Sequence, residues 1–204
     1  MGYTAIIDYG VGNLKSVSNA LAYLGVDSEI TGDPCRLELA DAIILPGVGA
    51  FPDAADKLRE SGLEQILLRQ AGNKPLLGIC LGMQLLFQWG EEGRRCEGLG
   101  LISGGVRRIE TDLKLPHIGW NSLTFPRPSP LFRGLDEGCC VYFVHSFCGH
   151  TEDPDQEAAV TDYGGPVLAA VQDAARGVFG CQFHPEKSGE TGLAILQNFA
   201  ALNR

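Results

Sequence analysis

Short apolar runs that stop at glycine turns recur through the first half of this chain. Thr4–Asp8 precedes the turn Gly10-Val11-Gly12, and Ala42–Leu45 precedes Pro46-Gly47-Val48-Gly49. Pro75–Ile79 is apolar throughout, as is usual for strands buried on both faces of a sheet. Segments with helical periodicity separate these runs. Strands that alternate with helices predict a parallel sheet.

The same periodicity predicts the other elements of the first half. Apolar side chains at helical spacing indicate helices over Leu14–Leu24 and Pro52–Gln70, the second broken near Gly62. Asp27–Ile30 has the character of a further strand. Leu81–Trp89 is predicted to be one helix, because the charged, glycine-rich stretch after it offers no apolar face.

Beyond Leu101 candidate strands follow one another without a convincing helix, so this half is predicted to be antiparallel or mixed. These strands are Val106–Glu110, Leu123–Phe125, Val141–His145, Ala158–Thr161 and Val167–Val171. Gly177–Phe183 returns to an apolar strand, and Ser188 is expected to cap a closing helix. That helix has an apolar face formed by Leu193, Leu196, Phe199 and Ala200. The predicted architecture is a three-layer α/β fold with a mostly parallel central sheet and flanking helices, as a single domain over residues 1–204.

Composition excludes several classes of function. The net charge of -9 opposes nonspecific attraction to nucleic acid and to anionic membranes. No segment approaches the roughly 18 apolar residues of a membrane span, and the N-terminus has no basic leader, so a cytoplasmic location is expected. The seven cysteines form no CxxC pair and predict neither a disulfide framework nor a zinc site. Both a P-loop and a dinucleotide fingerprint are missing, and no cofactor or metal is predicted.

The sequence Gly78-Ile79-Cys80-Leu81-Gly82 carries the strongest chemical signal. It lies between an apolar strand and a helix, which is the pattern of a nucleophile elbow with cysteine in the serine position. The helix N-terminus favours a thiolate at Cys80, and the Leu81 N–H is directed to where an oxyanion would form. The alternative is an ordinary strand-to-helix turn whose glycines are coincidental.

A second signal is His184-Pro185-Glu186, at the end of the last apolar strand. Parallel sheets collect reactive groups at the carboxyl ends of their strands, so His184 is expected to meet Cys80 there, with Glu186 orienting the imidazole. The alternative for His184 is a structural role at a strand end. The turn around Val48 is a candidate for the second oxyanion donor, through a backbone N–H, or a plain turn.

Together the GxCxG elbow and the His-Pro-Glu stretch resemble the class I glutamine amidotransferase family over nearly the whole chain. Further stretches are similar to the glutaminase subunits of imidazole glycerol phosphate synthases. They are Asp8-Tyr9-Gly10-Val11-Gly12-Asn13-Leu14, Pro46-Gly47-Val48-Gly49, Pro116-His117-Ile118-Gly119-Trp120-Asn121 and Tyr142-Phe143-Val144-His145-Ser146-Phe147.

This resemblance implies the hydrolysis of glutamine through a thioester on Cys80. His184 would transfer the proton, and Glu186 would orient His184. It implies that ammonia passes to a separate (β/α)₈ cyclase subunit, which forms imidazole glycerol phosphate and aminoimidazole carboxamide ribotide in histidine biosynthesis. It also implies roles for residues outside the triad. Those that hold glutamine would be Gly47, Gln84, Ser146 and Phe147, and those at the subunit interface would be Asn13, Trp120 and Lys187.

Other interpretations stay open at this point. A cysteine hydrolase or peptidase of the same fold, an amidotransferase subunit for another acceptor, and a noncatalytic binding subunit would share much of the pattern. Gln84 has the alternative of a solvated helix residue, Trp120 of a core aromatic and Lys187 of a surface charge. His117 and His145 are interpreted as structural histidines.

Overall fold

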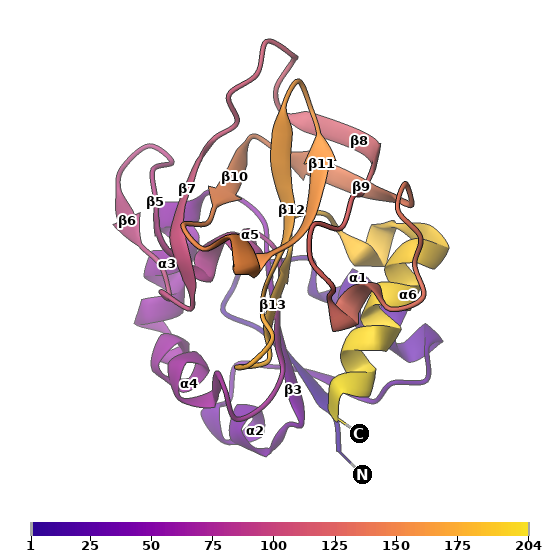
Figure 1. Ribbon diagram of the computed structural model, residues 1–204. Helices are drawn as coiled ribbons and strands as arrows, with labels where there is room; N and C mark the ends of the chain where they lie inside the picture. The colour runs from indigo at the N-terminus through magenta and orange to yellow at the C-terminus, as the bar shows by residue number, and fades with distance from the viewer. Residues whose placement is uncertain (1, 204) are drawn as a thin grey trace.

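A seven-stranded sheet runs through the centre of the computed structural model, which describes residues 2–203 (Figure 1). Its strands are β1 (Thr4–Ile7), β2 (Ser28–Thr31), β3 (Ala42–Gly47), β4 (Leu76–Cys80), β11 (Glu157–Asp162), β12 (Pro166–Asp173) and β13 (Val178–Cys181). They are arranged in the order β11-β12-β13-β4-β3-β1-β2. The pairs from β13 to β2 are parallel, whereas β11 and β12 extend one edge in antiparallel fashion. The prediction of a mostly parallel sheet is confirmed.

Helices cover both faces of this sheet (Figure 1). On one side pack α1 (Leu14–Tyr23) and α6 (Gly189–Ala200), and on the other α2 (Pro34–Leu39), α3 (Phe51–Glu60) and α4 (Leu63–Gln70). Successive strand side chains point to opposite faces, so in β1 Ala5 and Ile7 enter one hydrophobic core and Ile6 enters the other. The two cores make the fold three-layered, as predicted.

The second half adds smaller sheets next to the carboxyl ends of the central strands. The short helix α5 (Leu81–Leu85) leads into β5 (Phe87–Gly90), β6 (Cys96–Glu97), β7 (Ile102–Arg108), β8 (His117–Ser122), β9 (Cys140–His145) and β10 (Phe147–His150). One sheet has the order β10-β7-β5-β6, and β8 pairs with β9. Single 3-10 turns lie at Pro130–Phe132 (η1), Pro154–Gln156 (η2), Pro185–Lys187 (η3) and Ala201–Asn203 (η4). Only β5 and β7 pair in parallel among these strands, which confirms the mixed character of this half.

The predicted helix Leu81–Trp89 is wrong in its second part, where α5 stops at Leu85 and β5 begins. Continuing the helix would require the carbonyls of Leu85 and Leu86 to accept from residues one turn ahead. They accept instead from the backbone N–H groups of Leu99 and Leu101, at 2.8 Å in both cases. A segment that returns later in the chain therefore converts the end of this helix into a strand.

Other local predictions also needed correction. The segment Leu123–Phe125 is no strand but contains a single bridge from Thr124 to Val160, and the strand lies just before it in β8. The Ser188 side chain does not cap α6, because its hydroxyl donates to the His184 carbonyl at 2.6 Å and accepts from the Tyr142 N–H at 2.9 Å. Sequence periodicity missed α2, whose N-terminus is capped by the Asp33 carboxylate.

No helix among residues 2–203 is long and apolar enough to span a membrane.

Candidate active site

Cys80 stands at a sharp turn between β4 and α5. Its backbone angles are φ 54° and ψ -112°, and Cys80 is the only non-glycine residue between positions 2 and 203 with a positive φ. Such a conformation is strained and persists where the surrounding structure imposes it. A Cβ on Gly78 would lie 2.6 Å from the Gly82 carbonyl oxygen, and one on Gly82 would lie 1.7 Å from the Leu45 oxygen. The glycines of the elbow are therefore required by close backbone approach.

The parallel register brings the distant motifs to this turn. Cys80 pairs with Gly47 at the end of β3, while Ile79 pairs with Cys181 at the end of β13, shortly before His184. The cavity at these strand ends measures about 380 Å³. It is lined by Val48, Gly49, Cys80, Leu81, Gln84, Glu92, Pro116, Val144, His145, Ser146, Phe147 and His184. A larger hollow of about 470 Å³ between Phe125 and Arg133 is lined by no cysteine, histidine or carboxylate.

His184 and Glu186 form a buried pair beside the nucleophile candidate. The His184 Nδ1 and Glu186 Oε1 atoms are 2.8 Å apart, and the two side chains are 3% and 1% exposed. Burial by itself lowers the pKa of His184, but the Cys80 sulfur and the Glu186 carboxylate outweigh it and raise the pKa to about 9. Nε2 of His184 is buried and makes no hydrogen bond within the described part of the chain. The arrangement matches that of a nucleophile, a base and an orienting acid.

The sequence matches the family model "Glutamine amidotransferase class-I" over residues 5–202. The chain belongs to the class I glutamine amidotransferase family. Imidazole glycerol phosphate synthase subunit HisH of Caldanaerobacter subterraneus subsp. tengcongensis is 50% identical over 97% of each chain. The HisH subunit of Moorella thermoacetica is 48% identical over 98% of this chain and 95% of the relative.

Solved structures agree on the fold. PurLQS from Thermotoga maritima superposes with a TM-score of 0.80 at 21% identity, covering 100% of this chain and 99% of that one. A second solved structure, of a glutamine amidotransferase, has a TM-score of 0.77 at 20% identity and covers 99% of both chains. These similarities support the amidotransferase fold alone.

Of the residues expected to hold glutamine, some line the cavity and one packs behind the elbow. Gln84 is 5% exposed and lines the cavity, so its alternative as a solvated helix residue is wrong. Gln84 Nε2 donates to the Phe147 carbonyl at 3.0 Å. Ser146 and Phe147 also line the cavity, whereas Gly47 packs behind the elbow, where a Cβ would lie 2.9 Å from the Gly82 nitrogen.

The oxyanion candidates lie on both sides of Cys80. Leu81 is the first residue of α5 and contributes to the cavity wall. Val48 also lines the cavity and is 44% exposed, and Gly49 follows it with a φ of 102°. Nothing lies within 4 Å of a Cβ built on Gly49, so this glycine is required by its backbone conformation and not by crowding.

Sequence reasoning did not single out Glu92, which lines the cavity, or Gln182, which contacts Cys80. Glu92 lines the cavity and accepts a hydrogen bond from the Phe51 N–H at 2.8 Å. It lies in the glycine-rich stretch, which carries no local motif. Gln182 is fully buried, and its Nε2 lies 3.8 Å from the Cys80 sulfur. A glutamine in the otherwise apolar run Gly177–Phe183 was the sequence signal that could have identified it.

His117 and His145 form a buried pair, as their interpretation as structural residues anticipated. His145 Nδ1 lies 2.8 Å from the Phe147 carbonyl, and its Nε2 lies 3.1 Å from His117 Nδ1. Burial lowers the pKa of His145 to about 4, so the ring is neutral near neutral pH. With both nitrogens occupied, His145 has no free lone pair to act as a base.

The residues expected at a subunit interface lie on neighbouring surface elements. Trp120 of β8 is 58% exposed, which excludes the alternative of a core aromatic, and it approaches Gly189 near the start of α6. Lys187 of η3 is exposed, and Asn13 precedes α1, which contacts η3. No group of three or more His, Cys, Asp or Glu side chains that could hold a metal ion occurs in residues 2–203.

Proposed function

We propose that this chain hydrolyses glutamine to glutamate and ammonia through a thioester on Cys80. The observation that carries the proposal is the elbow cysteine beside the buried His184–Glu186 pair in one cavity. Membership of the class I glutamine amidotransferases and the half-identical HisH subunits support the same activity. The ammonia would go to a separate cyclase subunit, which forms imidazole glycerol phosphate and aminoimidazole carboxamide ribotide in histidine biosynthesis.

The chemistry follows from the charges around Cys80. A protonated His184 favours the thiolate of its neighbour, and this thiolate adds to the carboxamide carbon of glutamine. The backbone N–H groups of Leu81 and Val48 stabilise the oxyanion that forms. His184 Nε2 donates its proton to the nitrogen, the C–N bond breaks and ammonia leaves. Neutral His184 then takes a proton from water, the water oxygen attacks the thioester, and the thiolate departs as glutamate is released.

The cavity offers groups that suit the rest of the substrate. The Glu92 carboxylate is a partner for the α-ammonium group of glutamine, because opposite charges pair strongly in a partly enclosed site. Gln84, Ser146 and Phe147 surround the remaining volume, and the main chain at Gly47 supports the turn behind the elbow.

We propose the surface around Trp120, Lys187 and Asn13 as the docking site of the cyclase, in a heterodimer. Tryptophan is frequent among the residues that anchor interfaces, and both Trp120 and Lys187 are exposed here. We also propose that residues 1–204 act as a single domain in the cytoplasm, without nucleic-acid or membrane binding, in keeping with the net charge of -9.

The test is glutamate release from glutamine by wild type, Cys80→Ala and a control Cys181→Ala, each alone and with a cyclase subunit plus its nucleotide ligand. Cys181 is buried in β13, and burial raises the pKa of its thiol, so it should be chemically inert. We expect activity in the wild-type and Cys181→Ala mixtures, and a loss of about 10⁶ in turnover for Cys80→Ala.

Three other outcomes would redirect or refute the proposal. Activity that ignores the cyclase would keep the glutaminase but point to another acceptor subunit. Full activity of Cys80→Ala would refute the thioester, and inactivity of the wild type in every mixture would favour a peptidase or a noncatalytic subunit.

A further inference from the structure

The side-chain amide of Gln182 lies between Cys80 and Gln84, a residue that lines the cavity. Gln182 is fully buried just beyond β13, and its backbone N–H donates to the Ala169 carbonyl at 2.8 Å. Its Nε2 is 3.8 Å from Cys80 Sγ, within the usual reach of a hydrogen bond to sulfur. Its Oε1 accepts from Gln84 Nε2 at 3.0 Å. Gln182 takes part in none of the proposed steps of glutamine hydrolysis.

The direction of these hydrogen bonds is determined by a group that has no proton. The Phe147 carbonyl can only accept, so the Gln84 atom 3.0 Å from it must be the NH₂ group. The same Gln84 nitrogen faces Gln182, which must therefore present its oxygen there. The Gln182 NH₂ group is consequently directed at Cys80 Sγ. His145 Nδ1 also donates to the Phe147 carbonyl, at 2.8 Å.

We propose that Gln182 donates a hydrogen bond to the Cys80 thiolate and is a further catalytic residue of this site. The inference rests on the proposed function, since it takes Cys80 as the nucleophile. The thiolate attacks in the first half of the reaction and leaves in the second, so a fixed donor raises the fraction of thiolate present for the attack and stabilises the thiolate as it departs. Water cannot replace the donor easily, because Gln182 has no exposed surface.

The test compares Gln182→Met with Gln172→Met. Gln172 is a matched control, because it is also buried, lies on the adjacent strand β12, and donates through Nε2 to the Pro128 carbonyl at 3.0 Å, away from Cys80. Iodoacetamide alkylation of Cys80 would be followed by peptide mass spectrometry from about pH 5 to 10, which separates it from the exposed Cys35 and Cys140. The pH midpoint of alkylation reflects the coupled titration of Cys80 and His184. The quantity to compare is therefore the difference in this midpoint between each variant and the wild type.

We expect the alkylation midpoint of Gln182→Met to rise by about 0.5 to 1 pH unit, with kcat about 3- to 10-fold lower near neutral pH. Gln172→Met should keep the wild-type midpoint. An unchanged midpoint in folded Gln182→Met would overturn the inference even if its kcat falls, because a purely structural glutamine would not move the titration of the thiol.

A measurement on unsubstituted protein covers the case in which Gln182→Met does not fold. In ¹⁵N-labelled protein the Gln182 side-chain NH₂ resonance should shift with the midpoint of Cys80 alkylation and stop titrating once Cys80 is alkylated. A resonance that ignores Cys80 would refute the inference. If Cys80→Ala retained full glutaminase activity, the proposed function itself would fail, which is a separate result.

Discussion

The charge on His184 links the three residues of the proposed triad. Its pKa of about 9 arises because the Cys80 sulfur and the Glu186 carboxylate overcome the effect of burial. Glu186 contributes through a contact of 2.8 Å and has no other role visible among the described residues, since its second oxygen is buried without a hydrogen-bond partner. At the scale of single residues, Glu186 should therefore act on the proton of His184 and not on substrate binding.

Glu186→Gln tests this. The amide keeps the shape but removes the charge, so the pKa of His184 should fall and its tautomer should no longer be held. We expect kcat to drop about 10²- to 10⁴-fold with little change in KM. The pH dependence of kcat and the titration of the His184 ring by NMR would both be followed. If the pKa of His184 in this variant equalled that in the wild type, the Glu186 carboxylate would not be a cause of the raised pKa.

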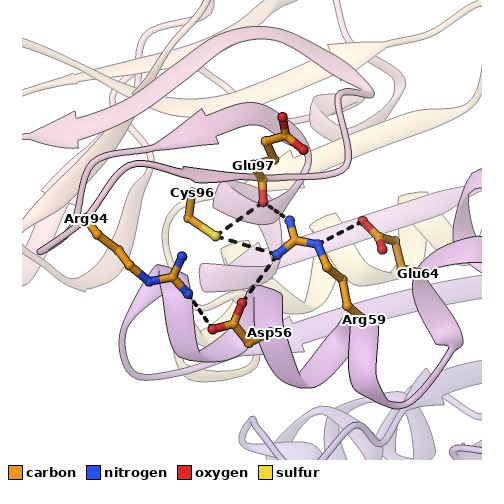
Figure 2. Close-up of polar contacts among 6 residues, drawn as sticks. All are labelled: Asp56, Arg59, Glu64, Arg94, Cys96 and Glu97. Carbon is orange, nitrogen blue, oxygen red and sulfur yellow. Dashed lines mark hydrogen bonds and ion pairs between the residues drawn. The ribbon is translucent and has the colours of Figure 1, made fainter.

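At the scale of elements, a polar network joins the β5–β6 hairpin to α3 and α4 (Figure 2). Arg59 Nη1 lies 3.4 Å from Asp56 and 3.6 Å from the Cys96 sulfur, and its Nε lies 3.6 Å from Glu64. Arg59 also donates to the Glu97 carbonyl, and Arg94 pairs with Asp56. The segment that these contacts fasten includes Glu92, which lines the cavity.

Removing the centre of this network should loosen the hairpin. For Arg59→Met we expect KM for glutamine to rise about 3- to 10-fold with kcat nearly unchanged, and stability to fall by about 1 kcal/mol because the contacts are partly exposed. Arg69→Met is the control, since Arg69 makes a single exposed ion pair with Glu38 at 3.4 Å. Steady-state kinetics and urea unfolding would be measured. Equal KM values in the two variants would contradict the proposed link to Glu92.

At the scale of the whole molecule, buried histidines make stability depend on pH in opposite directions. Burial lowers the pKa of His145 from 6.5 to about 4, so between these values the unfolded chain binds a proton that the folded chain does not. Stability is therefore lost as pH falls through this window. His184 has the opposite effect, because its pKa is raised in the folded chain. Its contribution to the free energy of unfolding is complete below about pH 6.5 and disappears as pH rises toward about 9.

The expected loss from His145 between pH 6.5 and pH 4 is about 3 kcal/mol in the free energy of unfolding. Urea unfolding of the wild type would be compared with His145→Gln, whose amide can still donate to the Phe147 carbonyl. The variant should have a flatter pH dependence over this window, whatever its absolute stability. Identical slopes would show that other groups cause the acid sensitivity.

Much of the fold and of the proposed triad could be predicted from the sequence because the signals are local. A strand buried on both faces must be apolar at every position, as in Pro75–Ile79, and a cysteine in a sharp turn needs flanking glycines. Parallel strands place their carboxyl ends at the same edge of the sheet. The predicted parallel topology was therefore enough to predict that Cys80 and His184 lie close together.

Only the tertiary structure decided the end of α5 and the environments of Glu92, Gln182 and Trp120. The Leu85 and Leu86 carbonyls accept from backbone that returns at Leu99 and Leu101, which no periodicity within the helix can reveal. The direction of the Gln182 amide depends in the same way on the carbonyl of a distant strand. Such features arise from polar groups finding partners far along the chain, and that pairing is settled only when the chain has folded.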